Sequence, residues 1–417
     1  MKRILMLGGN YVQSAAIERA KALGYHTIVV DMDAACYGRG LADEFYHIST
    51  TDEKCVYELA RKKHVDGILS YVSDVSALTA AVVAERLSLP TNPSASVDIL
   101  THKDKFRDFM TAAGLRTPFH ASFSKDEGDA ALRFAEEHPL PLIVKPTDSA
   151  GSKGVMRVDR YEDFPKAFDC ACGYARHGRI IVEQFIEKKG YEGEAEGFLC
   201  DGKIEFLGFL EQFHNDARNP FAPIGNGYPS SMEQRYRDKL RTLLVRVFAE
   251  LQMNFGAFNV EFLVGQDDEV YLVEIGPRNG GNMIPEMVES ACGVDMVTAS
   301  VKACVGDDYK AALQPKYHRV ASTYVIQSMK DGVLKDVLFP EELQKRIVKR
   351  FVTASRGDRI QAFRLGGDGL GTMVLRFDSV EQMDDEMSRM WDIIKVEVEE
   401  LPCDSEGKEN GQSSFVE

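Results

Sequence analysis

Short apolar segments alternate with amphipathic segments along the first hundred residues. The predicted elements are, in order, a strand at Ile4–Leu7, a helix at Ser14–Leu23, a strand at Thr27–Asp31, a helix at Glu53–Lys63, a strand at Gly67–Tyr71 and a helix at Ser76–Leu87. Apolar strands separated by amphipathic helices are typical of a parallel sheet with helices on both faces. Right-handed crossovers then predict a doubly wound α/β unit.

Two places beyond the carboxyl ends of these strands are candidate ligand sites, Gly8-Gly9-Asn10 and Ser73-Asp74. The first is an incomplete dinucleotide fingerprint, because G-x-G-x-x-G needs a later glycine and Tyr11-Val12-Gln13 follows instead. Asp31 stands where a ribose-binding acid would, which alone is a weak signal. The pattern therefore disfavours an NAD-dependent dehydrogenase.

The pattern between residues 89 and 305 mixes longer helices with paired strands. After the turn-rich segment Leu89–Ser94, helices are predicted at Lys103–Ala113, Arg235–Leu251 and Pro285–Cys304, and strands at Leu142–Lys145, Val155–Val158 and Ile180–Phe185. Two hairpins are predicted, Ala195–Leu199 with Ile204–Phe209 around Asp201-Gly202, and Ala257–Val264 with Glu269–Ile275. Gln212–Ser231 is rich in Asn, Pro and Gly, which predicts a surface loop.

Strands and short loops follow Ser322, with one helix predicted at Val380–Trp391. We therefore expect an N-terminal domain at residues 1–98, a central domain at 99–320 and a small closing domain at 321–403. The polar end, residues 404–417, is predicted to be disordered. The expected fold class is α/β, or α+β over the whole chain.

Composition narrows the possible partners. The formal net charge of the 417 residues is −15 and no basic patch is visible, so we expect no nucleic-acid partner. No apolar run is long enough to span a bilayer, and the start of the chain lacks a signal-peptide pattern. The eight cysteines form no C-x-x-C pair, which favours structural thiols over a metal site. A reduced, cytoplasmic location is expected, with no membrane partner.

Two carboxylates in the second predicted hairpin are candidate metal ligands. Glu261 and Glu274 lie on neighbouring strands, and Arg278 follows within a few residues. If both carboxylates face one cleft, they form an oxygen site suited to Mg²⁺, and Arg278 is placed to clamp a phosphate or carboxylate. A hairpin with solvated acids is the alternative interpretation.

A lysine and a small-residue loop form the second motif. Lys145 ends an apolar strand, and the loop Ser149-Ala150-Gly151-Ser152-Lys153-Gly154 follows it. The loop offers unhindered backbone N–H groups for phosphates, although its spacing is not that of a Walker A loop. An ordinary hairpin turn is the alternative.

The third motif is an acidic strand end. It comprises Ile180-Ile181-Val182-Glu183-Gln184-Phe185-Ile186, followed by acids at Glu192, Glu194 and Glu196. Free backbone groups at a strand end suit an adenine edge, and a nearby carboxylate suits ribose hydroxyls. Acids on a solvated edge are the alternative.

In this order the three motifs resemble the ATP-grasp superfamily, which includes glycinamide ribonucleotide synthetase, the large subunit of carbamoyl phosphate synthetase and amino-acid ligases. The resemblance covers about residues 1–305 and implies a lid at about 116–200. It assigns ATP phosphates to Lys103 and Lys145, the phosphate loop to Ser149, Gly151, Ser152 and Gly154, the adenine hinge to Glu183, Gln184, Phe185 and Ile186, ribose to Glu192, Mg²⁺ or Mn²⁺ to Glu261 and Glu274, and the transferred phosphate to Arg278. Lys105 is a neighbouring alternative to Lys103.

One position departs from the family pattern. The family often has Asn two residues after the second metal-binding Glu, where this chain has Gly276. Asn259, Asn279 or a water molecule is a possible replacement, so the number of metal ions stays open.

The resemblance implies an ATP-dependent ligase that activates a small carboxylate as an acylphosphate and transfers it to an amine. Alternatives are a bicarbonate-using enzyme that forms a carboxylated or carbamoyl product, and a non-catalytic ATP-binding module. A homodimer is a further expectation from the family. For His214, Asn215 and Arg218 exposed loop polarity is favoured over a substrate role, and for Arg364–Gly371 a plain glycine-rich turn is favoured over a cover for the site.

Overall fold

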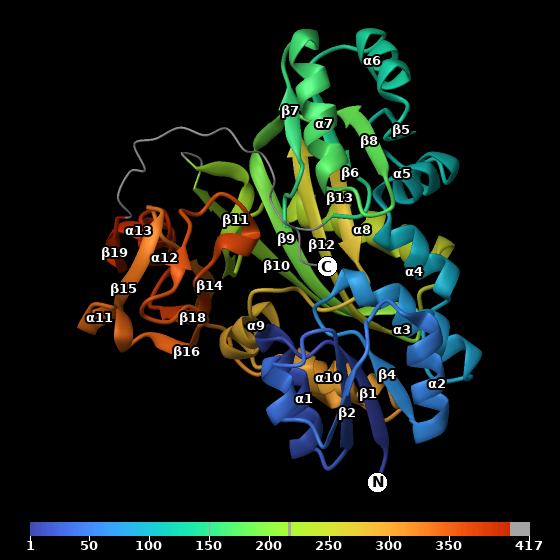
Figure 1. Ribbon diagram of the computed structural model, residues 1–417, viewed down its shortest axis with the longest axis vertical. Helices are drawn as coiled ribbons and strands as arrows, with labels where there is room; N and C mark the ends of the chain where they lie inside the picture. The colour runs from blue at the N-terminus through green and yellow to red at the C-terminus, as the bar shows by residue number, and fades with distance from the viewer. Residues whose placement is uncertain (150, 216–217, 401–417) are drawn as a thin grey trace.

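The computed structural model describes residues 1–149, 151–215 and 218–400. The predicted tail, residues 404–417, lies outside the described residues. The chain forms a parallel sheet near the N-terminus, a small antiparallel sheet at the far end, and a long central sheet that continues into the C-terminal segment (Figure 1).

The N-terminal sheet is parallel throughout, as predicted. Its strands are β1 (Arg3–Leu7), β2 (His26–Asp31), β3 (Glu44–His47) and β4 (Gly67–Leu69), in the order β3-β2-β1-β4. The edge strand β3 was not predicted, because its sequence is short and partly polar. The reversal of strand order between β1 and β4 places the ends of these strands at the point where open α/β sheets bind ligands.

Alternate residues of β1 pack into two different hydrophobic cores, one on each face of the sheet. Leu5 and Leu7 pack with α2 (Glu53–Lys63) and α3 (Asp74–Arg86). Ile4 and Met6 face the opposite side, where the covering helices are α1 (Ser14–Ala22) and α10 (Met296–Ala303). Because successive strand residues point to opposite faces, both faces of the sheet are buried, and one of them is covered by a helix from much later in the chain.

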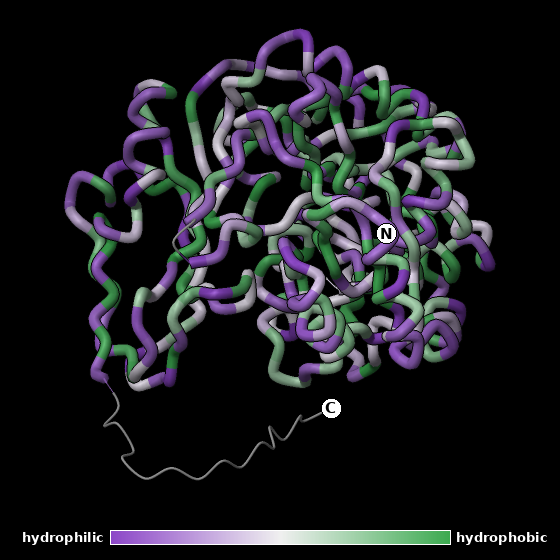
Figure 2. The backbone as a smooth tube through the Cα atoms, turned by 90° about the horizontal axis from the view of Figure 1, so that it is seen from above, coloured by the Kyte–Doolittle hydropathy of each residue, from purple (hydrophilic) through white to green (hydrophobic). Residues whose placement is uncertain are grey.

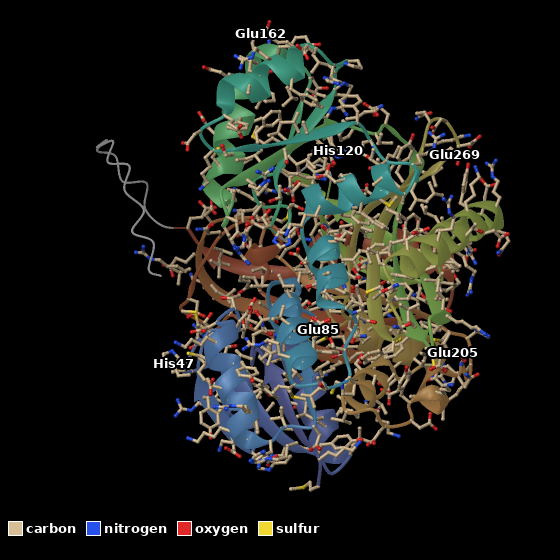
Figure 3. All side chains as sticks on the ribbon, turned by 90° about the vertical axis from the view of Figure 1, so that its right-hand side faces the viewer. His47, Glu85, His120, Glu162, Glu205 and Glu269 are labelled. Carbon is tan, nitrogen blue, oxygen red and sulfur yellow. The ribbon has the colours of Figure 1, made fainter. Side chains whose placement is uncertain are left out.

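The second sheet lies within residues 116–200, the range that the resemblance predicts as a lid, and the unit formed by this sheet and its helices is called the lid below. The sheet comprises β5 (His120–Ser124), β8 (Arg179–Gln184), β6 (Leu142–Pro146) and β7 (Met156–Val158), all antiparallel and in that order. Helices α6 (Gly128–Glu136) and α7 (Phe164–Tyr174) share a core with these strands. Figure 1 shows this unit at the top, and Figure 3 labels Glu162 at its tip and His120 nearer its base.

The central sheet has the order β13-β12-β9-β10-β11-β14-β18-β16. Its first five strands are β13 (Val270–Gly276), β12 (Gly256–Gly265), β9 (Lys188–Cys200), β10 (Lys203–Asn215) and β11 (Asn219–Tyr228). Helices α4 (Ser94–Thr101), α5 (Lys103–Ala112) and α8 (Gln234–Glu250) pack in one core with it. Helices α9 (Ile284–Cys292) and α10 share a different core with strands of this sheet. Both predicted hairpins are confirmed, with longer strands than expected.

The prediction of a surface loop at Gln212–Ser231 was wrong. β10 continues to Asn215, and β11 fills most of the remainder. Ala222 and Ile224 on β11 are fully buried, and Gly225 permits a close approach by β14, because a Cβ there would lie 2.2 Å from the Thr323 carbonyl oxygen. Glycine in this strand therefore marks tight packing, not a turn.

The C-terminal segment extends the central sheet beyond residue 320. β14 (Val320–Ile326), β18 (Gly371–Phe377) and β16 (Ile347–Val352) add to it, while β15 (Gly332–Leu338), β17 (Arg359–Ile360) and β19 (Lys395–Glu399) form a small sheet. Its helices are α11 (Glu341–Gln344), α12 (Val380–Met387) and α13 (Met390–Ile393), the last two replacing the single predicted helix. From above, this segment stands to one side (Figure 2). In the described part of the chain, no helix is long and apolar enough to cross a membrane.

Candidate nucleotide and phosphate site

A cavity of about 590 Å³ lies where the lid, the central sheet and α5 meet. Thirteen of the predicted site residues line it, namely Lys103, Lys145, Ser149, Gly151, Ser152, Glu183, Gln184, Phe185, Ile186, Glu192, Glu261, Glu274 and Arg278. Gly154 is not among the residues that line the cavity. A Cβ at this position would meet the side chains of Pro146 and Tyr174. The fold thus gathers into one cavity residues that span 175 positions in the sequence, from Lys103 to Arg278.

Carboxylates stand side by side on three neighbouring strands. In the strand register Glu261 lies opposite Glu274 on one side and opposite Glu194 on the other. Burial, followed by the charges of Glu274 and Glu194, raises the pKa of Glu261 well above its ordinary value. Burial acts in the same direction on Glu274, but the charges of Lys103 and Arg278 outweigh it and lower the pKa to about 2. Such a row of acids is stabilised by a nearby cation.

Lys103 supplies one such cation. It is the first residue of α5, and its Nζ lies 2.9 Å from Glu274 Oε2 and donates to the Ser149 carbonyl at 3.1 Å. Lys105 points elsewhere and donates to both carboxylate oxygens of Asp98, at 2.8 and 2.7 Å. The structure therefore brings Lys103, and not Lys105, to the cavity.

Lys145 belongs to a buried cluster of three charges. Its Nζ forms an ion pair with Glu183, whose other oxygen accepts from Arg107 Nε at 2.8 Å. Arg107 also donates to the carbonyls of Leu272 and Val273, each at 3.0 Å. Burial alone would raise the pKa of Glu183, but Arg107 and Lys145 lower it to about 2. Glu183 therefore joins the lid to α5, and Arg107 extends this connection to β13.

Sequence reasoning missed Arg107, although a signal for it exists. It stands four residues after Lys103 in α5, and residues four apart share one face of a helix. Lys103 and Arg107 both line the cavity as a result.

The predicted hinge joins β8 to β9 and carries an aromatic ring. The Phe185 N–H donates to the Pro141 carbonyl at 3.1 Å, which fixes the segment against the lid. The Arg157 guanidinium lies 4.3 Å from the centre of the Phe185 ring, and the Phe221 ring meets it edge-on at 6.4 Å. The other apolar side chains that line the cavity include Ile143, Val155, Ile186, Leu263 and Leu272. Such a wall suits a flat heteroaromatic ring.

Glu192 also lines the cavity. Its carboxylate is 2.8 Å from Lys188 Nζ in a partly exposed ion pair. Exposed pairs of this kind contribute little to stability, so the carboxylate can exchange partners at low cost.

The predicted phosphate loop contacts both β11 and the C-terminal segment. Gly151, Ser152 and Gly154 all have left-handed backbone angles, with φ of 71°, 61° and 72°. The Ser152 hydroxyl donates to the Phe221 carbonyl on β11, and Gly366 of the C-terminal segment lies beside Gly151. Gly366 also lines the cavity, and it is the one residue of the segment Arg364–Gly371 among the described lining residues.

Arg278 is held by a residue of the N-terminal sheet. Its Nη2 donates to the carboxylate of Asp74, the first residue of α3, and its Nη1 donates to the Asn279 carbonyl at 3.2 Å. Its buried Nε has no hydrogen-bond partner among the described residues. Ser73-Asp74, one of the two predicted ligand positions, thus lies at the cavity through Asp74.

Asn259 and Asn279, the possible replacements for a side chain at Gly276, both contact a buried acid, and Asn259 also lines the cavity. Both donate to the carboxylate of Glu196, at 2.9 and 3.2 Å, and the Gly280 N–H does so at 3.0 and 2.9 Å. Burial raises the pKa of Glu196 to about 8, although these donors oppose the rise. Acids at alternate positions 192, 194 and 196 share one face of a strand, a signal from which only Glu192 was assigned.

The other predicted ligand position, Gly8-Gly9-Asn10, is occupied by side chains of the protein itself. The Gln13 side-chain amide occupies the space beside Gly8, where a Cβ would lie 2.1 Å from it. The Asp31 carboxylate accepts from the Gly9 and Asp33 N–H groups, at 2.7 and 2.8 Å. Both groups that an NAD site would use therefore already have partners.

The loop residues considered for a substrate role lie elsewhere. Asn215 is buried beside Met329 Sδ, and Arg218 donates to the Met329 carbonyl at 2.6 Å. Neither of them, nor His214, is among the described residues that line the cavity. Within the described ranges, no group of three or more His, Cys, Asp or Glu side chains could hold a metal ion.

Comparison with known families agrees with this geometry. A family model for the ATP binding domain of the carbamoyl-phosphate synthase L chain matches residues 102–312, half of the chain, and a model for the ATP-grasp N-terminal domain matches residues 17–91. The chain belongs to the ATP-grasp family. The matched ranges contain every residue that lines the cavity except Gly366.

Relatives of this ATP-grasp protein differ widely in size. The carbamoyl phosphate synthase large chain of Vibrio cholerae is 24% identical over 289 residues, which are 68% of this chain and 26% of that protein. The chain thus spans about a quarter of the length of that relative.

Solved structures show the same fold. An L-amino acid ligase from Bacillus licheniformis matches with a TM-score of 0.79 and 19% identity, over 96% of this chain and 99% of that one. The biotin carboxylase domain of the 2-oxoglutarate carboxylase of Hydrogenobacter thermophilus matches with a TM-score of 0.73 and 16% identity, over 95% and 91%. The latter was solved with MgADP and bicarbonate. ATP and Mg²⁺ are accordingly ligands of the family.

Proposed function

We propose that this ATP-grasp protein is an ATP-dependent ligase, which activates a small carboxylate as an acylphosphate and joins it to an amine or similar nucleophile. The observation that carries the proposal is the set of groups that line one cavity. Apolar side chains around Phe185, the cations Lys103 and Lys145, the paired carboxylates and Arg278 all line it. This combination is what a base, its phosphates, their metal ion and a reacting group require.

In this proposal the adenine lies against Phe185 and Ile186, and Glu192 accepts from the ribose hydroxyls. Lys103 and Lys145 face the phosphates. Backbone N–H groups of the loop at Ser149–Gly154 add further donors, since left-handed glycines leave such groups accessible.

Glu261 and Glu274 would hold Mg²⁺ or Mn²⁺. The fit rests on their direct pairing across β12 and β13 and on the unfavourable proximity of two acids, which a divalent cation relieves. Mg²⁺ commonly takes one or two carboxylates and completes its shell with water and phosphate oxygens. The ion would neutralise charge on the transferred phosphate.

The chemistry follows two displacements. A carboxylate oxygen of the substrate bonds to the terminal phosphorus while the bond to the ADP oxygen breaks. The amine nitrogen then bonds to the acyl carbon, phosphate leaves, and the amine loses a proton. Arg278 orients the transferred phosphate, Lys103 and Lys145 offset its charge, and the loop near Gly366 keeps water from the acylphosphate.

The second candidate uses bicarbonate as the carboxylate. The bicarbonate present in the 2-oxoglutarate carboxylase structure favours it. The third candidate function is a non-catalytic nucleotide-binding module, and the departure from the family pattern at Gly276 favours it. The substrates in the first two candidates are small molecules, and a homodimer stays a prediction.

Phosphate release tests the proposal. The wild-type protein is incubated with Mg-ATP and separate pools of amino acids, hydroxy acids, amines or bicarbonate. Phosphate and ADP should appear only with particular pools, and release should fall about a hundredfold or more in Glu274→Gln. The matched control is Glu269→Gln, since Glu269 lies on the same hairpin but at its outer turn (Figure 3).

The outcomes separate the candidates. Release that requires bicarbonate favours the second, and nucleotide binding without release in any pool favours the third. Equal release by wild type and Glu274→Gln would contradict the assignment of the metal site.

A further inference from the structure

The contact between Asp74 and Arg278 joins two distant parts of the chain at the cavity. Asp74 begins α3 on the N-terminal sheet, and Arg278 follows β13 of the central sheet. Their side chains are 27% and 11% exposed, so the pair is largely shielded from water. Asp74 holds one end of the guanidinium, while the buried Nε keeps a donor without a partner among the described residues.

Gly276 is the residue that leaves room for this contact. A Cβ at position 276 would lie 2.7 Å from Arg278 Cζ and 2.9 Å from Asp74 Oδ1. A side chain there would force the Arg278 guanidinium or the Asp74 carboxylate to move, because real Cβ contacts are not that short. The Asn that the family often carries at this position would therefore displace the pair from the positions seen here.

The turn that presents Asp74 is held in an unfavourable conformation. Val72, two residues before Asp74, has a φ of 54°. A β-branched residue rarely adopts this left-handed region, and such conformations persist where the surroundings require them. The turn places the first residue of α3 over Arg278.

We propose that Asp74 is a positioning residue for Arg278, in the space that Gly276 leaves free. The carboxylate fixes the guanidinium so that its remaining donors face the terminal phosphate. The N-terminal sheet thereby contributes to the phosphate site through a residue that need not touch the nucleotide. This inference rests on the proposed function, because it assumes that Arg278 meets the transferred phosphate.

Nucleotide affinity tests the inference without turnover. Dissociation constants of Mg-AMPPNP and Mg-ADP are measured by calorimetry, and their ratio reports recognition of the terminal phosphate. Arg278→Ala should lower the preference for Mg-AMPPNP. Asp74→Ala should lower the preference for Mg-AMPPNP about tenfold or more. The affinity for Mg-ADP should change less than about twofold, because a misplaced Arg278 loses only its contact with the terminal phosphate, which Mg-ADP lacks.

Two further variants show whether orientation or charge matters. Asp74→Asn should keep most of the preference, since its amide oxygen can still accept from the guanidinium. Glu53→Ala is the control, because Glu53 is an exposed acid at the first residue of α2 on the same sheet. A tighter Mg-AMPPNP complex in both Asp74 variants, or no change in Asp74→Ala, would overturn the proposal.

Thermal unfolding of the nucleotide-free protein gives an independent readout. Gly276→Asn should lower the melting temperature strongly in the wild type, and less when combined with Asp74→Ala, which removes one of the two side chains near the new Cβ and releases the Arg278 guanidinium to move. Additive effects would refute the proposed placement of Asp74. Absence of nucleotide binding by the wild type would instead refute the proposed function, and with it a phosphate role for Arg278.

Discussion

Two buried glutamates of the site show how neighbours decide the charge of a side chain. Glu183 is enclosed by the cations Arg107 and Lys145, which lower its pKa to about 2. Glu196 is equally enclosed but has only neutral donors, the amides of Asn259 and Asn279 and the Gly280 N–H, and burial raises its pKa to about 8. Neutral hydrogen bonds offset less of the desolvation cost than full charges do.

The raised pKa of Glu196 predicts a pH dependence of stability. The unfolded chain releases this proton near the ordinary glutamate pKa, whereas the folded protein keeps it until about pH 8. The folded state therefore binds more protons between these values, and the free energy of unfolding falls as pH rises through them. Glu196→Gln should resemble wild type at pH 5 and exceed it by on the order of 3 kcal/mol at pH 8.5.

Urea unfolding at a series of pH values measures this difference. Glu205→Gln serves as the control, since Glu205 is exposed on β10 (Figure 3). A difference between Glu196→Gln and wild type that stays constant from pH 5 to pH 8.5 would mean that Glu196 is ionised throughout, held by its donors.

At the scale of elements, β11 links the central sheet to the C-terminal segment. It pairs with β10 on one side and with β14 on the other. Its Phe221 carbonyl accepts from Ser152 of the lid loop, and the Asn219 side chain donates to the Arg364 carbonyl at 2.7 Å. Substitutions that disturb the packing of β11 are thus expected to change both the free energy of unfolding and the shape of the cavity.

Gly225→Ala should destabilise the protein by about 1–3 kcal/mol or more. The added Cβ would meet the Thr323 carbonyl oxygen at 2.2 Å and the Met387 methyl group at 2.8 Å. Chemical denaturation measures the loss. Gly173→Ala on α7 is the matched control, because nothing lies within 4 Å of a Cβ there and alanine favours helix. Equal stability of both variants would contradict the close approach of β11 and β14.

At the scale of the whole molecule, the cavity is assembled from five regions. α5 contributes Lys103, the lid contributes Lys145, the central sheet contributes Glu274, and the N-terminal and C-terminal segments contribute Asp74 and Gly366. A ligand that contacts all of them stabilises their mutual arrangement.

Mg-ADP should therefore raise the melting temperature, by an amount equivalent to about 2.7 kcal/mol at a hundred times its dissociation constant. Excess EDTA should remove most of this gain, because the phosphates and the acids Glu261 and Glu274 repel each other without a divalent cation. Scanning fluorimetry measures the shift, with EDTA on the nucleotide-free protein as the control. An undiminished shift in EDTA would contradict metal binding by these acids.

The local pattern of the sequence was sufficient for most elements and for the composition of the site. Strand and helix periods predicted the N-terminal sheet, α8 and both hairpins, because apolar spacing depends directly on backbone geometry. Pairing of Glu261 with Glu274 followed from the hairpin between them. The roles proposed for these residues stay predictions.

The sequence alone determined which residue types gather at the site and the fold class that presents them. Only the tertiary structure decided contacts between segments far apart in the chain. Asp74 meets Arg278 across 204 residues, Glu196 collects two asparagines, and Gly225 admits β14. Such contacts depend on three-dimensional packing, and a polar or glycine residue gives the same local signal in a loop as in a tightly packed strand.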